Sequence, residues 1–166
     1  MVPRRLVLIR HAKAAGGAVD ADRPPTEGGT RQAAAIGPWL EQAGLVPDRV
    51  LVSPARRAAQ TWEAAAPTSA ARPTTEPRIY DNTVEALLAA IRETPDDVST
   101  LALVGHNPSI GELAHALDDG QGSPAARQAL DAGFPTGAVA VFVVGGSFGE
   151  LEPGGARVSD FARPEG

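Results

Sequence analysis

Hydrophobic residues gather in short uninterrupted runs along this chain, and the runs end at charged or polar residues. The first run, Leu6 to Ile9, leads directly into Arg10 and His11, and the run from Leu101 to Val104 leads through one glycine to His106. Apolar runs without alternation are typical of strands buried on both faces, as in a parallel sheet. We therefore predict two buried strands that carry these basic side chains at their carboxyl ends.

Further strands follow from the same kind of pattern. Val50 to Val52 forms a short second run, and residues 139–144 are rich in β-branched residues. The glycine-rich segment 145–149 then reads as a hairpin connection into Leu151 and beyond. A weak strand is expected near residues 78–80, after a linker that covers residues 66–73.

Helical spacing appears between these runs. Apolar residues recur every three to four positions up to Ala43, which predicts one helix opened by Thr26 and ended by Gly44 as its C-cap. Ser53 and Pro54 are expected as the N-cap and the first position of the next helix.

Two more helix starts are predicted. Asn82 with Glu85 three residues later has the spacing of a capping box. Residues 107–109 are expected to start a helix that runs through Leu117, and residues 118–125 read as a loop.

Strands that alternate with helices predict an α/β fold. We expect one domain over residues 1–166, with a layered α/β/α architecture, a mostly parallel central sheet and an antiparallel hairpin at its edge near the C-terminus. The 166 residues are enough for one hydrophobic core.

Net charge and composition limit the classes of partner and the cellular location that we expect. The formal net charge of −5 argues against nucleic acid as a partner, because backbone phosphates bind basic surfaces. The chain has no cysteine, which excludes disulfides and thiolate chemistry and agrees with a reducing cytoplasm. The run from Leu6 to Ile9 is too short for a signal core or a membrane span, so we expect a cytoplasmic protein without membrane contact.

Three familiar chemistries are not supported by the sequence. The letters Gly-x-Ser-x-Gly occur at residues 145–149, but this segment is predicted as a hairpin connection and not as the strand-to-helix turn of a serine nucleophile elbow. A P-loop is absent as well. The three histidines lack the spacing of a metal site. We expect no cofactor and no metal.

Four motifs follow one another along the chain. They are Arg10-His11-Ala12, Arg23-Pro24-Pro25-Thr26 with Gly29, Ser53-Pro54 with Arg57-Ala58-Ala59-Gln60-Thr61, and Val104-Gly105-His106-Asn107-Pro108. Together they resemble the histidine phosphatase superfamily, which has a phosphoglycerate mutase-like fold, and within it the SixA-type phosphohistidine phosphatases. Departures are modest, since Ala12 stands where the superfamily more often has glycine and Pro25 where leucine is usual.

The resemblance implies a role for each motif residue. His11 would be the nucleophile that carries the phosphoryl group. Arg10 and Arg57 would bind the phosphoryl oxygens, with Arg57 rather than Arg56 in the family position. His106, kept charged by the phosphoryl dianion, would donate to a phosphoryl oxygen.

The general acid stays open among three carboxylates. Asp20 lies three residues before Arg23, where SixA-type proteins resemble this chain, while Asp81 and Glu85 are its rivals. An imidazole leaves phosphohistidine more readily than an alkoxide leaves an ester, so an ambiguous general acid is more tolerable in a phosphohistidine phosphatase than in a sugar phosphatase.

The expected function is that of a phosphatase with a covalent phosphohistidine intermediate, acting on phosphohistidine of a protein. Short connections around the site favour access by a protein over a lidded pocket. The alternatives are a phosphatase of small phosphomonoesters and a non-catalytic phosphate-binding module. We expect a monomer whose partner is a phosphorylated protein or a small phosphorylated substrate.

Overall fold

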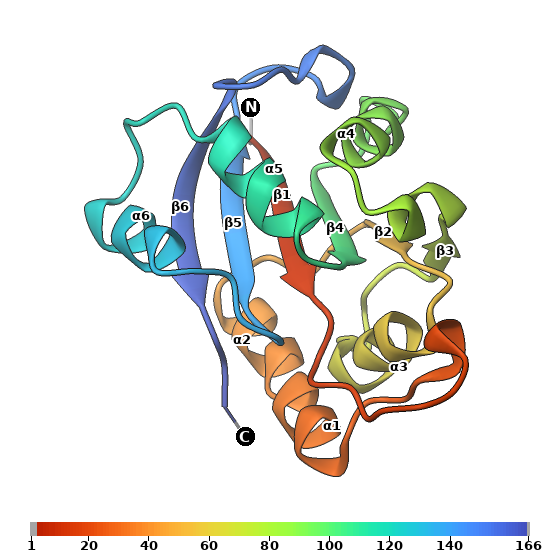
Figure 1. Ribbon diagram of the computed structural model, residues 1–166. Helices are drawn as coiled ribbons and strands as arrows, with labels where there is room; N and C mark the ends of the chain where they lie inside the picture. Colours follow the sequence, from red (N-terminus) through yellow and green to blue (C-terminus); the bar gives the residue numbers. More distant parts are fainter. Residues whose placement is uncertain (1–2, 166) are drawn as a thin grey trace.

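The computed structural model of the chain describes residues 3–165, so the outermost positions of the predicted domain, residues 1, 2 and 166, lie outside it. Its sheet is six-stranded, in the order β3-β2-β4-β1-β5-β6. Strand β1 therefore lies inside the sheet with a partner on each side (Figure 1). The strands are β1 (Arg4–Arg10), β2 (Arg49–Val52), β3 (Pro73–Thr75), β4 (Thr100–Gly105), β5 (Val139–Val144) and β6 (Ala156–Ala162).

The predicted mostly parallel sheet is confirmed. Strands β1, β2, β3 and β4 pair in parallel, whereas β5 pairs antiparallel with β1 and β6 antiparallel with β5. The edge hairpin is therefore present, although its connection also contains the 3-10 helix η3 (Phe148–Glu150). The parallel register sets Arg10 beside Gly105, so the residues that follow β1 and β4 leave the sheet at the same edge.

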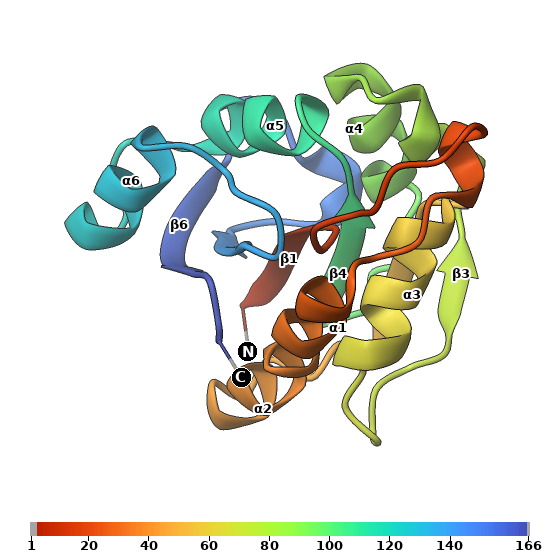
Figure 2. The same ribbon diagram turned by 60° about the horizontal axis from the view of Figure 1, so that its bottom comes forward.

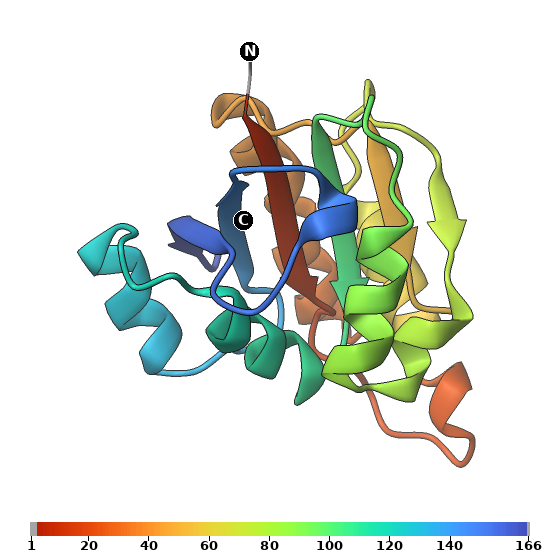
Figure 3. The same cartoon turned by 90° about the horizontal axis from the view of Figure 1, so that it is seen from above.

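Helices cover both faces of the sheet, as Figure 3 shows with the orange and yellow helices on one side and the green and cyan ones on the other. The α-helices are α1 (Glu27–Ala34), α2 (Ile36–Gln42), α3 (Arg56–Ala65), α4 (Val84–Arg92), α5 (Ser109–Leu117) and α6 (Pro124–Asp131).

The core follows from the alternation of side chains along β1. Leu6 and Leu8 belong to a cluster with α4, α5 and α6, whereas Val7 and Ile9 belong to a second cluster with α2 and α3. All four are completely buried. Burial on both faces is why the strand reads as a continuous apolar run, and it anchors the strand that ends at His11.

The single helix expected over residues 26–43 is wrong, because the chain forms α1 and α2 with a break at Ala35. Pro38 has no N–H to donate to the carbonyl of Ala34, which interrupts the ladder at this point. Thr26 does cap α1, since its hydroxyl accepts from the Gly29 N–H. Gly44 follows α2 with a φ of +70°, as a terminating glycine should.

Two predicted caps are displaced by one or more residues. Helix α3 begins at Arg56 after an extended Ala55, so Ser53 is not its N-cap and Pro54 is not its first residue. Asn82 has a left-handed φ of 61°, and Thr83 caps α4 in its place through the Ala86 N–H. The side chains of Ser53 and Asn82 instead form hydrogen bonds with residues far away in the sequence.

The region between α3 and α4 and the loop before β5 also differ from expectation. Residues 78–80 lie in the 3-10 helix η2 (Pro77–Asp81) rather than in a strand. The predicted linker ends at Pro73, which is the first residue of β3, and the three residues of this strand are all exposed at the edge of the sheet. Helix α6 was not predicted, although Ser123 before Pro124 is the capping pattern that could have indicated it.

None of the helices within residues 3–165 has the length and apolar character that crossing a membrane would need.

Candidate active site

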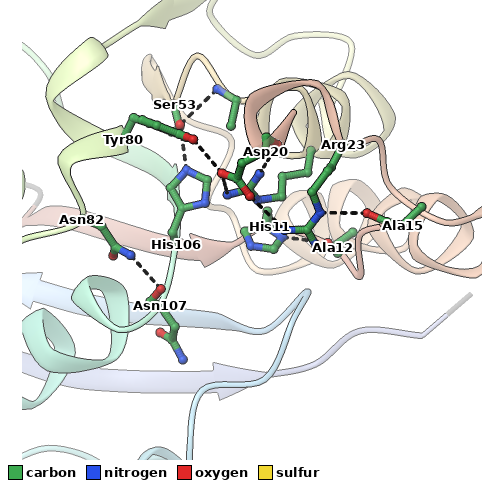
Figure 4. A network of polar contacts seen from close by, with 12 residues as sticks. His11, Ala12, Ala15, Asp20, Arg23, Ser53, Tyr80, Asn82, His106 and Asn107 are labelled. Atoms are coloured by element: carbon green, nitrogen blue, oxygen red, sulfur yellow. Dashed lines mark hydrogen bonds and ion pairs between the residues drawn. The ribbon is translucent and has the colours of Figure 1, made fainter. Parts of the chain in front are cut away.

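Two histidines face each other at the carboxyl edge of the sheet. His11 follows β1 and His106 follows β4, and the His11 N–H donates to the Gly105 carbonyl at 3.0 Å. Their ring centroids are 5.2 Å apart (Figure 4). Figure 2 shows this edge, which the chain after β1 crosses to the 3-10 helix η1 (Asp20–Asp22) before it returns to α1. Parallel pairing therefore brings together residues 95 positions apart in sequence, 106 minus 11.

His11 is held as a neutral imidazole. Its Nδ1 lies 2.8 Å from the Ala12 carbonyl, which can only accept, so Nδ1 carries the proton and Nε2 keeps its lone pair. The side chain is buried, and this burial lowers the pKa of His11 to about 4, with Arg57 and Arg10 adding to the effect. At neutral pH the imidazole is therefore unprotonated at Nε2.

His106 is hydrogen-bonded to Ser53. The Ser53 hydroxyl oxygen accepts from the Ala55 N–H at 3.2 Å and lies 2.7 Å from His106 Nε2. A hydroxyl has one hydrogen and two lone pairs, so Ser53 can donate to Nε2 when the ring proton sits on Nδ1, or accept from Nε2–H in the other tautomer. The His106 Nδ1 is buried without a partner within residues 3–165. In the Nδ1–H tautomer this nitrogen can donate toward a phosphoryl oxygen.

The pKa of His106 is lowered to about 3, first by burial and then by the nearby His11, Arg57 and Arg10. The ring is neutral in this arrangement. The expectation of an imidazolium depends on the charge of a bound phosphoryl dianion, and it stays a prediction.

Arg57 points into the site while Arg56 is exposed. The Arg57 guanidinium donates to the Asp20 carbonyl at 2.9 Å and to the Asp20 carboxylate at 3.2 Å. The position expected from the family motif is thus the buried one. Arg10 donates to the Phe134 carbonyl at 2.9 Å, which directs it to the loop before β5.

Asp20 is the centre of a charged network beside the histidines (Figure 4). Tyr80 donates to its carboxylate at 2.6 Å, and Arg23 forms an ion pair with it at 3.0 Å. These contacts, together with Arg57, hold the pKa of Asp20 well below its usual range. Asp20 is therefore brought to the site, but as an ionised carboxylate.

The two rival carboxylates lie outside this network. Asp81 and Glu85 are both exposed, and neither makes a side-chain hydrogen bond within the described part of the chain. The identity of the general acid stays a prediction.

Sequence reasoning missed two supports of the site. Tyr80 packs edge-on against His106, with ring centroids 5.8 Å apart, but its place in η2 has no local signal. Thr61 accepts from the Ala12 N–H at 2.9 Å and donates to the Arg57 carbonyl at 2.6 Å. The buried Thr61 hydroxyl connects the loop after β1 to α3. The sequence identifies Thr61 only as part of a motif and does not predict this contact.

The described residues contain no group of three or more His, Cys, Asp or Glu side chains arranged to hold a metal ion. The site offers two imidazoles and two guanidiniums at one sheet edge. Such a set can bind a phosphoryl group and attack its phosphorus.

Comparisons with known proteins agree with this geometry. Residues 6–86 match the family model described as the histidine phosphatase superfamily, branch 1. An uncharacterized protein of Mycobacterium tuberculosis is 36% identical over 94% of this chain and 99% of its own. The phosphohistidine phosphatase SixA of Escherichia coli is 32% identical over 72% of this chain and 78% of its own.

Solved structures show the same likeness over nearly the whole chain. A putative phosphohistidine phosphatase SixA from Nakamurella multipartitia has a TM-score of 0.86 at 33% identity, covering 97% of this chain and 96% of its own. A SixA protein histidine phosphatase in complex with tungstate has a TM-score of 0.78 at 25% identity, covering 96% and 97%.

Proposed function

The chain belongs to the histidine phosphatase superfamily and is a phosphatase, and from that premise we propose that it removes phosphate from phosphohistidine on a protein through a covalent intermediate on His11. The observation that carries this proposal is the neutral His11 with its Nδ1 proton fixed on the Ala12 carbonyl. That hydrogen bond leaves Nε2 as the free nucleophile.

The proposed reaction has two steps. Nε2 of His11 attacks phosphorus, the bond from phosphorus to the leaving imidazole breaks, and the leaving nitrogen takes up a proton. Water then attacks the phosphohistidine, which releases inorganic phosphate and restores His11. Arg10 and Arg57 stabilise the charge on the phosphoryl oxygens, and Nδ1–H of His106 donates to one of them.

The state of Asp20 supports a phosphohistidine substrate. A low pKa leaves Asp20 without a proton to give at neutral pH. An ester with a poor leaving group would need such a proton, whereas imidazole, with an ordinary pKa of about 6.5, can leave by taking a proton from water.

The rim of the site supports a protein substrate. Among the large apolar side chains of residues 3–165, only Val19 and Tyr80 are exposed, at 58% and 39%. Val19 precedes Asp20 in the sequence, and the Tyr80 hydroxyl donates to the Asp20 carboxylate. Val19 and Tyr80 therefore both lie beside the charged network. Large contiguous apolar patches rimmed by polar residues mark protein-contact sites, and these two side chains supply a small apolar area beside the polar site. SixA relatives named as phosphohistidine phosphatases point the same way.

The test is phosphate release from a phosphohistidine-bearing protein and from para-nitrophenyl phosphate, at neutral pH in the presence of a chelator. Release from the phosphoprotein should fall by roughly 10³-fold or more in His11→Ala, as when a covalent nucleophile is removed. Arg56→Ala is the matched control, since this exposed neighbour of Arg57 should leave the rate unchanged.

Release from the ester alone would reassign the chain to small phosphomonoesters. No release from either substrate would favour the phosphate-binding module. Activity that survives His11→Ala would refute the covalent intermediate.

A further inference from the structure

A hollow opens beside the active site, between α1, the loop after β1 and the chain that follows β6. Its volume is about 460 Å³. Figure 1 shows the chain after β6 descending on the side of α1 and α2. The residues that line the hollow are Lys13, Thr26, Gly28, Gly29, Arg31, Gln32, Arg163 and Glu165.

The hollow adjoins the backbone around His11, at the carboxyl end of β1. Lys13 lies two residues after His11, and its carbonyl accepts from the Thr26 N–H at 2.8 Å. Gln32 packs against Gly137, whose N–H is shared between the carbonyls of Arg10 and His11. A substrate held at His11 therefore has this hollow directly next to it.

Three cations line the hollow, and none of them is ion-paired within residues 3–165. They are Lys13, Arg31 and Arg163, and all three are exposed. Glu165 is the single carboxylate among the lining residues. Arg23, Arg57, Arg78, Arg127 and Arg157 form ion pairs, whereas other arginines, such as Arg56 and Arg72, form none within residues 3–165. The three cations of the hollow differ from these because they line one cavity together.

Arg163 is also held in place. Its Nε donates to the Thr136 carbonyl at 2.9 Å and its Nη2 lies 3.4 Å from the Thr136 hydroxyl. The charge of Arg163 contributes to lowering the pKa of Arg10, which shows that the two guanidiniums repel each other. Like charges set side by side without a partner favour binding of an anion.

We propose that this hollow is a docking subsite for the carboxylate side chains that flank the phosphorylated histidine of a protein substrate. The proposal rests on the proposed function and names the chemistry of its substrate. With a net charge of −5, the molecule as a whole repels an acidic partner, whereas the lining of the hollow, with three cations and one carboxylate, has a net positive charge. A local reversal orients an acidic segment so that its phosphohistidine reaches His11.

The experiment compares two phosphohistidine peptides of equal length, one with aspartates and the other with asparagines on the same flank. At about 0.1 M salt the native chain should show a kcat/KM roughly fivefold higher for the acidic peptide, a preference that fades at about 1 M as screening shortens the reach of the charges. The double variant Lys13→Ala/Arg163→Ala should bring the ratio close to one, and Arg163→Glu should lower it further.

Arg72→Ala is the matched control, because Arg72 is an exposed arginine just before β3, at the opposite edge of the sheet from β6. It should leave the ratio as in the native chain. Equal kcat/KM for the two peptides in the native chain would overturn the docking subsite and leave the proposed function standing, and so would an equal loss of preference in Arg72→Ala. Hydrolysis of para-nitrophenyl phosphate without turnover of either peptide would overturn the protein substrate and the subsite with it.

Discussion

We propose that the Ser53 hydroxyl donates to His106 Nε2 and so keeps the ring proton on the buried Nδ1, from which it is given to the phosphoryl oxygen. In this proposal Ser53 is a positioning residue that acts on substrate through His106. The same hydroxyl accepts from the Ala55 N–H and does not cap α3.

Replacing Ser53 should change both the rate and the tautomer. In Ser53→Ala, His106 loses the partner of Nε2, and kcat should fall roughly tenfold, in line with the net contribution of one hydrogen bond. Nitrogen chemical shifts of the His106 ring should show a shift of population toward the Nε2–H tautomer. Ser53→Thr keeps a hydroxyl at this position and should recover much of the native kcat and of the native tautomer population. A native tautomer and native kcat in Ser53→Ala would contradict the assignment.

At the scale of the elements, the docking of α1 against the chain after β1 decides where His11 lies. Gly29 is buried in the first turn of α1, and a Cβ there would lie 2.5 Å from the Lys13 carbonyl. A side chain at this position would push the helix away from the strand end. Gly29 is the glycine that the family motif contains, and close approach of two backbones is its physical reason.

Neighbouring glycines provide a matched test of this contact. Gly29→Ala should lower the free energy of unfolding by about 1–3 kcal/mol, as overpacking does, and should reduce kcat because the Lys13 backbone moves. Gly28→Ala should instead be neutral or stabilise by up to about 1 kcal/mol, since its Cβ would meet nothing closer than 3.7 Å and alanine favours a helix. Urea unfolding of both variants measures the difference. Equal effects of the two substitutions would refute the close approach.

At the scale of the whole molecule, the buried histidine pair couples folding to pH. The pKa values of His11 and His106 are lowered from 6.5 to about 4 and about 3. The unfolded chain binds protons at both rings below about pH 6.5, whereas the folded chain does so only at much lower pH. The stabilisation is therefore complete above about pH 6.5 and is lost as the pH falls toward the folded pKa values.

The free energy of unfolding should drop by roughly 2 kcal/mol or more between about pH 7 and about pH 5. The two contributions are not additive, because each ring influences the other. Urea unfolding across this range measures the slope for the native chain and for His11→Asn/His106→Asn. The double variant should be flatter, and an unchanged slope would show that other groups cause the pH dependence.

The expected monomer stays a prediction. The exposed β3 is only three residues long and begins at Pro73, which makes it a poor template for pairing with a second sheet. The exposed large apolar side chains of residues 3–165 both lie at the active site, where they serve the proposed substrate contact.

The amino-acid sequence alone determined the class of fold and the place of the chemistry. The apolar runs and the helical spacing are local patterns, so they indicate strands, helices and strand ends without knowledge of the rest of the molecule. His11 and His106 could be expected to share one edge because parallel strands end at the same side of a sheet. The family motifs then pointed to Arg57 rather than Arg56.

Only the tertiary structure decided how those residues are held. The bond from Ser53 to His106 spans 53 positions, and the bond from Tyr80 to Asp20 spans 60. The hollow joins Lys13 near the start of the chain to Arg163 near its end. Such contacts depend on strand order, register and the path of loops, and no local periodicity contains that information. The hydrogen bond between Ser53 and His106, the ionised state of Asp20 and the unpaired cations beside the site therefore became visible only once the sheet was assembled.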